Sequence, residues 1–249
     1  MSHILMSDEP PAFSVLNEHG QSNVVLLCDH ASNRVPKQFR GLGLDADQLA
    51  SHIAWDIGAL WVARYLSERL DAPLVFSNYS RLVIDCNRCL EREDLIPATS
   101  ANIAIPANEQ LTQEERLLRR IHFFDPYHKA IDALLSTRTS QTSLLLSIHS
   151  FTPFLHTQDR PWPIAVCYEN DSVLSKRLRI AMQAQLSEAV GDNEPYAVEE
   201  GIDYTLPIHG AKYDIPAIML EIRQDEIATE IAANSWGETI AAAWTKMND

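Results

Sequence analysis

Two histidines and one glutamate lie at the carboxyl ends of apolar runs that are typical of buried strands. These residues are His30, His149 and Glu221. Neutral imidazole binds zinc well, and a catalytic zinc site leaves one coordination position open for water. A single histidine at a strand end is usually a hydrogen-bonded structural residue. The joint placement of all three nevertheless predicts a shared metal ion with a general base beside it.

Other charged residues could complete such a site. Asp56 sits beside the apolar stripe of a predicted helix, where a carboxylate must be paired or bound to a metal, because burying it alone is costly. A salt bridge on a half-exposed face explains it equally well. Arg81, Asn87 and Arg88 bracket another predicted strand, and a guanidinium group offers a planar, two-pronged donor set for a carboxylate. The alternative for the arginines is a pair of weak surface ion pairs.

Cys86 and Cys89 form a Cys-x-x-Cys motif. A structural zinc site would need a second such pair, whereas Cys28 and Cys167 are solitary. A redox pair would need a helix directly after a strand to lower the thiol pKa, and residues 90–97 do not favour a helix. A thiol oxidoreductase therefore stays a less favoured alternative.

The elements that must position these residues alternate between strands and helices. The polar loop 87–111 is long, and long loops in compact domains are often functional. This alternation predicts a mostly parallel sheet with helices on both faces and a ligand site beyond the carboxyl ends of the strands. We expect strands at 23–28, 73–76, 82–86, 143–148, 164–168 and 217–222, helices at 51–70, 112–136 (bent near Pro126), 173–189 and 226–247, and irregular structure at 191–216.

Composition narrows the class of protein. The chain has 249 residues, with 20 Lys and Arg against 34 Asp and Glu, a net charge of −14. An acidic chain lacks the basic stripe that nucleic acid requires, but a local cationic pocket could still take a small anion. No apolar run approaches the roughly 18 residues of a membrane span, and the first residues do not resemble a secretory signal. Four cysteines suit a reducing cytoplasm, and the length suits one domain.

Six separated motifs stand in a familiar order. They are Asp29-His30-Ala31-Ser32-Asn33-x-x-Pro36, His52-Ile53-Ala54-Trp55-Asp56-Ile57-Gly58-Ala59, Tyr79-Ser80-Arg81-Leu82-Val83-Ile84-Asp85-x-Asn87-Arg88, Ser147-Ile148-His149-Ser150-Phe151-Thr152-Pro153, Gly191-Asp192-Asn193-Glu194-Pro195-Tyr196 and Glu221-Ile222-Arg223-Gln224-Asp225. With these motifs the chain resembles the N-formylglutamate amidohydrolase family from about residue 20 to its end. That family is distantly similar to zinc carboxypeptidases and aspartoacylases.

The resemblance implies a single catalytic domain over residues 1–249. Its fold would be a three-layer α/β sandwich with a mostly parallel, mixed central sheet, of the phosphorylase/hydrolase-like (zinc-carboxypeptidase-like) type. Carried over residue by residue, it implies one zinc ion on His30 and His149 and Glu221 as the general base. Arg81 would stabilise the transition state, and Asn87 and Arg88 would bind the substrate carboxylate.

One position departs from the related metal motif. The third residue after His30 is Asn33, where the related enzymes have a glutamate ligand. We assign the vacant ligand role to Asp56 and keep Asn33 as the alternative ligand, placed otherwise among the substrate-binding residues. His209 lies in the segment 191–216, which could fold over the substrate, and we expect it to contact substrate as well.

The function that the resemblance implies is metal-dependent hydrolysis of the amide of an N-formyl or other N-acyl amino acid. N-formyl-L-glutamate, giving formate and L-glutamate, is the first expectation. The expected partner is that small molecule, with no nucleic acid and no membrane; the oligomeric state stays open. Because Asn33 replaces a glutamate, the alternative is a noncatalytic carboxylate-binding protein on the same scaffold.

Overall fold

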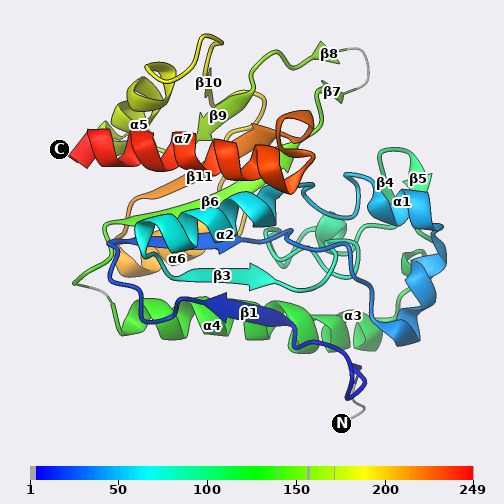
Figure 1. Cartoon of the computed structure of the whole chain (residues 1–249). Coiled ribbons are helices and arrows are strands. Elements are labelled where there is room, and N and C mark those ends of the chain that lie inside the picture. The colour runs from blue at the N-terminus through cyan, green and yellow to red at the C-terminus, as the bar shows by residue number, and fades with distance from the viewer. Residues whose placement is uncertain (1–3, 139, 156–157, 171, 249) are drawn as a thin grey trace.

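Figure 1 shows the computed structural model, which describes residues 4–138, 140–155, 158–170 and 172–248. A seven-stranded sheet lies at its centre. Four neighbouring strands of this sheet run parallel, while β1 and β9 run antiparallel to their inner neighbours, as the prediction of a mostly parallel sheet requires. The strand order is β1 (Phe13–Leu16), β3 (Leu74–Ser77), β2 (Val24–Cys28), β6 (Leu144–Phe151), β11 (Ala217–Arg223), β9 (Ile164–Cys167) and β10 (Gly191–Asp192).

Helices cover both faces of the sheet, which confirms the three-layer α/β prediction. Alternate side chains of each strand point to opposite faces, so β2 buries Leu26 in one apolar cluster and Leu27 in the other. Strands that are buried on both faces read as continuous apolar runs, which is why these segments could be recognised. One face packs against α2 (Ala59–Leu70), α5 (Val173–Gln183) and α7 (Glu230–Asn248), and the other against α4 (Asp125–Ser136) and α6 (Thr205–Tyr213).

The predicted strand at 82–86 is wrong. Leu82, Val83 and Ile84 are buried, but in a third apolar cluster beside the sheet rather than in it. The backbone turns here instead, since Val83 N–H donates to Ser80 and Asp85 N–H donates to Leu95. A short apolar run cannot by itself distinguish a strand from a buried turn. Short elements fill the rest of this region: η2 (Glu93–Leu95), β4 (Thr99–Ser100), β5 (Ile103–Ala104) and η3 (Pro106–Asn108).

The predicted helix at 51–70 begins later, at Ala59. Residues 51–58 form turns, and the helix begins after Gly58, whose φ of +82° is readily available to glycine. A Cβ atom on Gly58 would lie 2.2 Å from the carbonyl oxygen of Ile227, so the backbone approach also requires glycine. Consequently Asp56 lies in a turn, where its N–H donates to the carbonyl of His30 at 2.9 Å.

The remaining helices differ from prediction mainly at their ends. The helix expected at 112–136 opens with the Thr112–Glu115 capping box as α3 (Gln113–Arg119) and passes through a π-helical turn before α4. Segment 191–216 contains α6, so the prediction of irregular structure is wrong there. Other short elements are η1 (Lys37–Gly43), α1 (Ala46–Ala50), β7 (Phe154–Leu155), β8 (Gln158–Asp159) and η5 (Gln224–Ile227). In the described parts of the chain, no helix is both long and apolar enough to cross a membrane.

Candidate metal and active site

Three strand ends and one turn bring the predicted metal-site residues together. His149 on β6 and Glu221 on β11 are paired in register on neighbouring parallel strands, and His30 comes two residues after β2 ends. The turn before α2 adds Asp56 through its backbone hydrogen bond to His30. The carboxyl ends of parallel strands thus meet at one edge of the sheet, where ligands gather in such folds.

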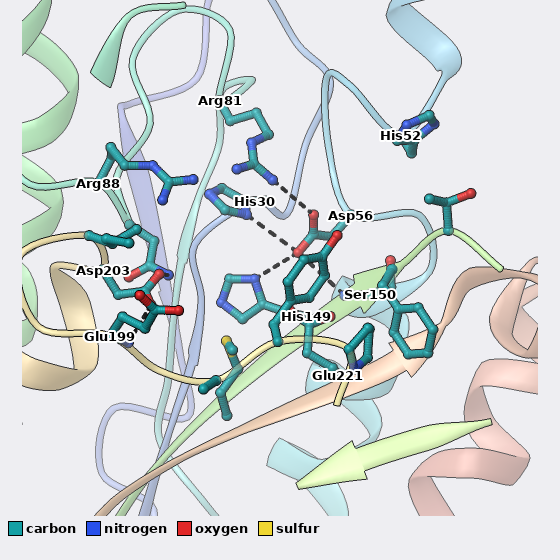
Figure 2. A pocket seen from close by; sticks show the side chains of 18 of the residues that line it. His30, His52, Asp56, Arg81, Arg88, His149, Ser150, Glu199, Asp203 and Glu221 are labelled. Carbon is teal, nitrogen blue, oxygen red and sulfur yellow. Dashed lines mark hydrogen bonds and ion pairs between the residues drawn. The ribbon is translucent and has the colours of Figure 1, made fainter. Parts of the chain in front are cut away.

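Ligand atoms of His30, Asp56 and His149 lie within 4.8 Å of one another and could hold a metal ion. Both imidazoles turn the same nitrogen toward the same oxygen. Oδ2 of Asp56 lies 2.8 Å from Nδ1 of His149 and 3.4 Å from Nδ1 of His30. Figure 2 shows the two rings converging on this carboxylate, and all three side chains are buried. Two imidazoles and one carboxylate form a common donor set for zinc.

A second carboxylate stands behind each imidazole. Nε2 of His30 lies 2.7 Å from Oδ1 of Asp85, and Nε2 of His149 lies 3.0 Å from Oδ2 of Asp29. Metal-binding histidines usually donate their other N–H group to a carboxylate or carbonyl oxygen, which fixes the tautomer and the ring orientation. These residues therefore fit a divalent metal, which the Nδ1 atoms that face Asp56 would hold.

Each oxygen of the Asp29 carboxylate takes part in two hydrogen bonds. Oδ1 accepts hydrogen bonds from Thr205 at 2.6 Å and Tyr127 at 3.0 Å, and Oδ2 accepts one from Ser147 at 2.9 Å in addition to His149. Burial alone would raise the pKa of Asp29, but the contact with His149 and the other donors outweighs it and lowers the pKa. Asp29 thus presents a fixed negative charge to the imidazole of His149.

The charged groups of the cluster shift one another's pKa values. Burial opposes the charge on Asp56, yet His30 and His149 hold the pKa of Asp56 below its usual range. Burial alone would lower the pKa of His149, but the hydrogen bonds that its ring donates to Asp29 and Asp56 raise this pKa well above its ordinary value. Each ring stands between two carboxylates, and these carboxylates raise the pKa of both imidazoles. A divalent cation would take the place of protons in this site.

Glu221 lies beside the cluster with one oxygen unsatisfied. Its side chain is 6% exposed, and Oε2 has no hydrogen-bond partner within the described residues. Burial raises the pKa of Glu221 to about 7, although the nearby charge on His149 acts against this rise. A carboxylate with a pKa near neutrality can both accept and return a proton, as a general base requires.

The two predicted arginines have different surroundings. Nη2 of Arg81 donates to Asp85 at 2.8 Å, and its Nη1 lies 3.6 Å from Asp56. Arg81 is therefore tied to the metal-site carboxylates. Arg88 is 3.6 Å from Asp94 and 3.9 Å from Asp85 at its nearest, and its buried Nε has no hydrogen-bond partner among the described residues. Arg88 thus retains donor capacity for a ligand.

A cavity of about 580 Å³ opens over the cluster. That volume lies within the range of roughly 300–1,000 Å³ that small-molecule sites occupy. Its lining residues are His30, His52, Asp56, Arg81, Asn87, Arg88, His149, Ser150, Phe151, Thr152, Asn193, Pro195, Tyr196, Ala197, Glu199, Ile202, Asp203, Met219 and Glu221.

Asn87 borders the cavity, but its side-chain amide is mainly hydrogen-bonded to other parts of the protein. Its Oδ1 accepts hydrogen bonds from the N–H groups of Tyr204 and Thr205 at the start of α6, and its Nδ2 donates to Asp203 at 3.0 Å. A side chain distant in sequence thus caps α6, which explains why no local capping residue announces the start of this helix.

Asn33 and His209 lie outside the lining of the cavity. Nδ2 of Asn33 donates to the carbonyl of Leu49 at 3.0 Å. His209 is buried between α6 and α4, where its Nε2 lies 3.0 Å from Nδ1 of His128 and its Nδ1 lies 3.2 Å from Asp132. Their predicted substrate contacts gain no support from these positions. From the sequence, either Asp56 or Asn33 could be the third metal ligand. In the structure, Asp56 is the residue that faces both imidazoles.

Sequence reasoning gave no role to Asp29, Asp85, Asp203 or Glu199. Asp29 directly precedes His30, and Asp85 lies two residues before Asn87. This proximity to predicted site residues could have identified both aspartates as part of the site. The other two lie in a loop that only the fold brings to the cavity. Cys86 and Cys89 are both free, and burial raises the thiol pKa of each, so neither has the thiolate character of a redox site.

The fold and the site together define a three-layer α/β protein with a buried His-Asp-His cluster that could hold a metal ion. A sequence profile described as N-formylglutamate amidohydrolase matches residues 22–228. Since this range covers most of the chain, the protein belongs to the N-formylglutamate amidohydrolase family, as its motifs predict.

Two solved structures resemble this chain over nearly its whole length. The gene product Atu2144 from Agrobacterium tumefaciens is 36% identical, with a TM-score of 0.89 over 99% of this chain and 100% of its own. The N-formylglutamate amidohydrolase from Ralstonia eutropha JMP134 is 16% identical, with a TM-score of 0.72 over 96% of this chain and 98% of its own. The second similarity concerns the fold alone. No curated protein sequence matches the chain significantly.

Proposed function

We propose that this protein is a metal-dependent amidohydrolase that removes a formyl or other acyl group from an N-acyl amino acid. Membership of the N-formylglutamate amidohydrolase family supports amide hydrolysis, and N-formyl-L-glutamate is the reference substrate. The observation that carries the proposal is the convergence of His30, Asp56 and His149 beside the unsatisfied carboxylate of Glu221.

Three residues would hold the metal, which we propose to be zinc: His30 and His149 through Nδ1, and Asp56 through a carboxylate oxygen. When bound, such an ion polarises a carbonyl group and lowers the pKa of water to about 7. Asp29 and Asp85 would keep the two rings in the tautomer that leaves Nδ1 free for the metal.

Glu221 would move the proton in the reaction. The water oxygen adds to the amide carbon, and Glu221 accepts the proton that this water loses. The carbon–nitrogen bond then breaks, the proton passes to the leaving nitrogen, and the products are a carboxylic acid anion and an amino acid. Arg81, which stays cationic between Asp56 and Asp85, would stabilise the negative charge that develops on the amide oxygen.

Arg88 would bind the carboxylate of the amino acid. Its side chain borders the cavity, and its buried Nε makes no hydrogen bond within the described residues, although it lies 3.6 Å from Asp94. Arg88 can therefore offer a charge-assisted hydrogen bond to a carboxylate. Asn87 would have a mainly structural role, because its hydrogen bonds fix the start of α6 beside Arg88. Fixing the carboxylate would orient the scissile amide over the metal site, and such positioning lowers the barrier of a bimolecular reaction.

We further infer that residues 1–249 act as one catalytic domain in the cytoplasm. His149 and Glu221 lie on neighbouring strands of the seven-stranded sheet, and the segments that follow β2 and precede α2 bring His30 and Asp56 to the same edge. The four cysteines are free, as expected in a reducing compartment.

Elemental analysis followed by a formate-release assay tests the proposal. We expect about one zinc ion per chain, hydrolysis of N-formyl amino acids, loss of activity with a chelator and recovery with added zinc. His149→Ala should lose both metal and activity, whereas His19→Ala, an exposed change in the turn after β1, should lose neither. A metal-loaded protein that cleaves no N-formyl or N-acyl amino acid would refute the proposal. Tight carboxylate binding by a metal-free protein without turnover would favour the noncatalytic binder.

A further inference from the structure

The cavity carries unequal charge at its two sides. Figure 2 shows Arg88, Asp203 and Glu199 together on one side, away from His52. All four residues line the cavity. A substrate whose carboxylate binds Arg88 therefore has two acidic side chains as near neighbours. The proposed function leaves their role unexplained.

The acidic residues sit on a turn that is firmly attached to the site. Asp203 accepts the N–H of Glu199 at 2.9 Å and the amide of Asn87 at 3.0 Å. Cys89 N–H donates to Ile202 at 3.0 Å, which ties the turn to the segment that contains Arg88. Because several hydrogen bonds fix this turn, the two carboxylates are a built feature of the cavity wall.

The cationic groups of the cavity can accommodate only one substrate carboxylate. Of the arginines in the described lining, Arg81 is committed to Asp85 and Asp56, so only Arg88 has free donor capacity. His52 does not add a charge near neutral pH, since burial and the nearby charges of Arg81 and Arg160 lower its pKa. A second carboxylate on the substrate would lack a cationic partner and would meet Asp203 and Glu199 instead. Like charges repel, and solvent screens this repulsion less at the half-buried Asp203 than at the exposed Glu199.

We propose that Asp203 and Glu199 form the side-chain subsite and select an N-acyl amino acid with one carboxylate and a hydrogen-bond donor on its side chain. A primary amide fits this description. The inference rests on the proposed function for the placement of the substrate carboxylate on Arg88. It predicts that N-formyl-L-glutamine is a better substrate than N-formyl-L-glutamate. The two compounds differ only at the end of the side chain, where the first has an amide and the second a carboxylate.

Three substrates test the inference with one assay, the release of formate by the zinc-loaded protein. We expect kcat/KM to be at least tenfold higher for N-formyl-L-glutamine than for N-formyl-L-glutamate. N-formyl-L-norleucine, which is neutral and has no side-chain donor, should fall between them. Equal or better hydrolysis of the glutamate compound would overturn the inference. Equal hydrolysis of the norleucine and glutamine compounds would overturn the recognition of a donor.

Glu199→Gln provides the matched variant, because Glu199 is exposed and its side chain holds no described part of the fold. The preference for the glutamine compound should shrink at least threefold in this variant. Glu200→Gln removes a neighbouring exposed charge outside the cavity lining and should leave the preference unchanged. An unchanged ratio in Glu199→Gln would overturn the role of Glu199.

The test separates failure of the inference from failure of the proposed function. Hydrolysis with a preference for glutamate would refute only the subsite. If none of the three compounds is hydrolysed, the proposed function fails, and calorimetric binding of the same compounds still measures the order of affinity. The order glutamine, norleucine, glutamate in binding would support the subsite; any other order would overturn it.

Discussion

Replacing Asp29 by asparagine tests the arrangement behind His149. The substitution keeps the size of the side chain but removes its charge. The carboxylate of Asp29 accepts four hydrogen bonds, and three of them come from hydroxyl groups that can rotate to accept a bond instead. We therefore expect Asp29→Asn to fold, with its main effect on His149.

The expected loss of metal affinity follows from the bond that changes. If the new amide oxygen faces His149, Nε2–H keeps a partner but loses the ionised one, and hydrogen bonds to charged groups contribute about 1.5–3 kcal/mol. If the amide nitrogen faces His149 instead, the ring must carry its proton on Nδ1, where the metal should bind. Both orientations weaken binding, and loss of such outer carboxylates typically costs roughly ten- to hundredfold in metal affinity.

Competition with a zinc chelator at fixed pH measures the change in Kd directly. Ser147→Ala is the matched control, because it removes a neutral donor from the same carboxylate and leaves the charge facing His149. We expect it to cost about 1 kcal/mol of stability, with a change in zinc affinity much smaller than that of Asp29→Asn. A folded Asp29→Asn variant that binds zinc within twofold of the unaltered protein would refute the reasoning.

Three further predictions concern other groups. Arg88→Ala should raise KM roughly ten- to hundredfold for a carboxylate substrate but little for the corresponding carboxamide; equal effects in steady-state assays would exclude the clamp. Glu221→Gln should lower kcat by about 10²–10⁴ while elemental analysis shows unchanged metal content, and near-normal turnover would exclude Glu221 as the base. Burial and the neighbouring His209 lower the pKa of His128 to about 3, so the unfolded chain binds more protons between pH 3 and about 6.5. As the pH is lowered below about 6.5, this group should reduce the free energy of unfolding by up to about 1.4 kcal/mol per pH unit. Urea unfolding at pH 7 and pH 5 tests this, because His128→Gln should lose less stability between the two pH values than the unaltered protein.

The amino-acid pattern was enough to predict the layered sheet and to place most of the candidate metal-site residues at one edge of it. Strands β2, β6, β9 and β11 are buried on both faces, so their continuous apolar runs could be read without neighbours. Neighbouring parallel strands have their carboxyl ends at the same edge of the sheet. This rule was sufficient to predict that His30, His149 and Glu221 lie together at that edge.

Contacts between segments far apart in the chain could be identified only in the folded protein. The run at 82–84 packs into a separate apolar cluster instead of the sheet, and α6 begins where Asn87 caps it from more than a hundred residues away. The choice of Asp56 over Asn33 likewise depends on a turn whose backbone bonds to His30. Local sequence records the apolar periodicity of an element, whereas a hydrogen bond between distant segments exists only after the chain has folded and carries no periodic signal.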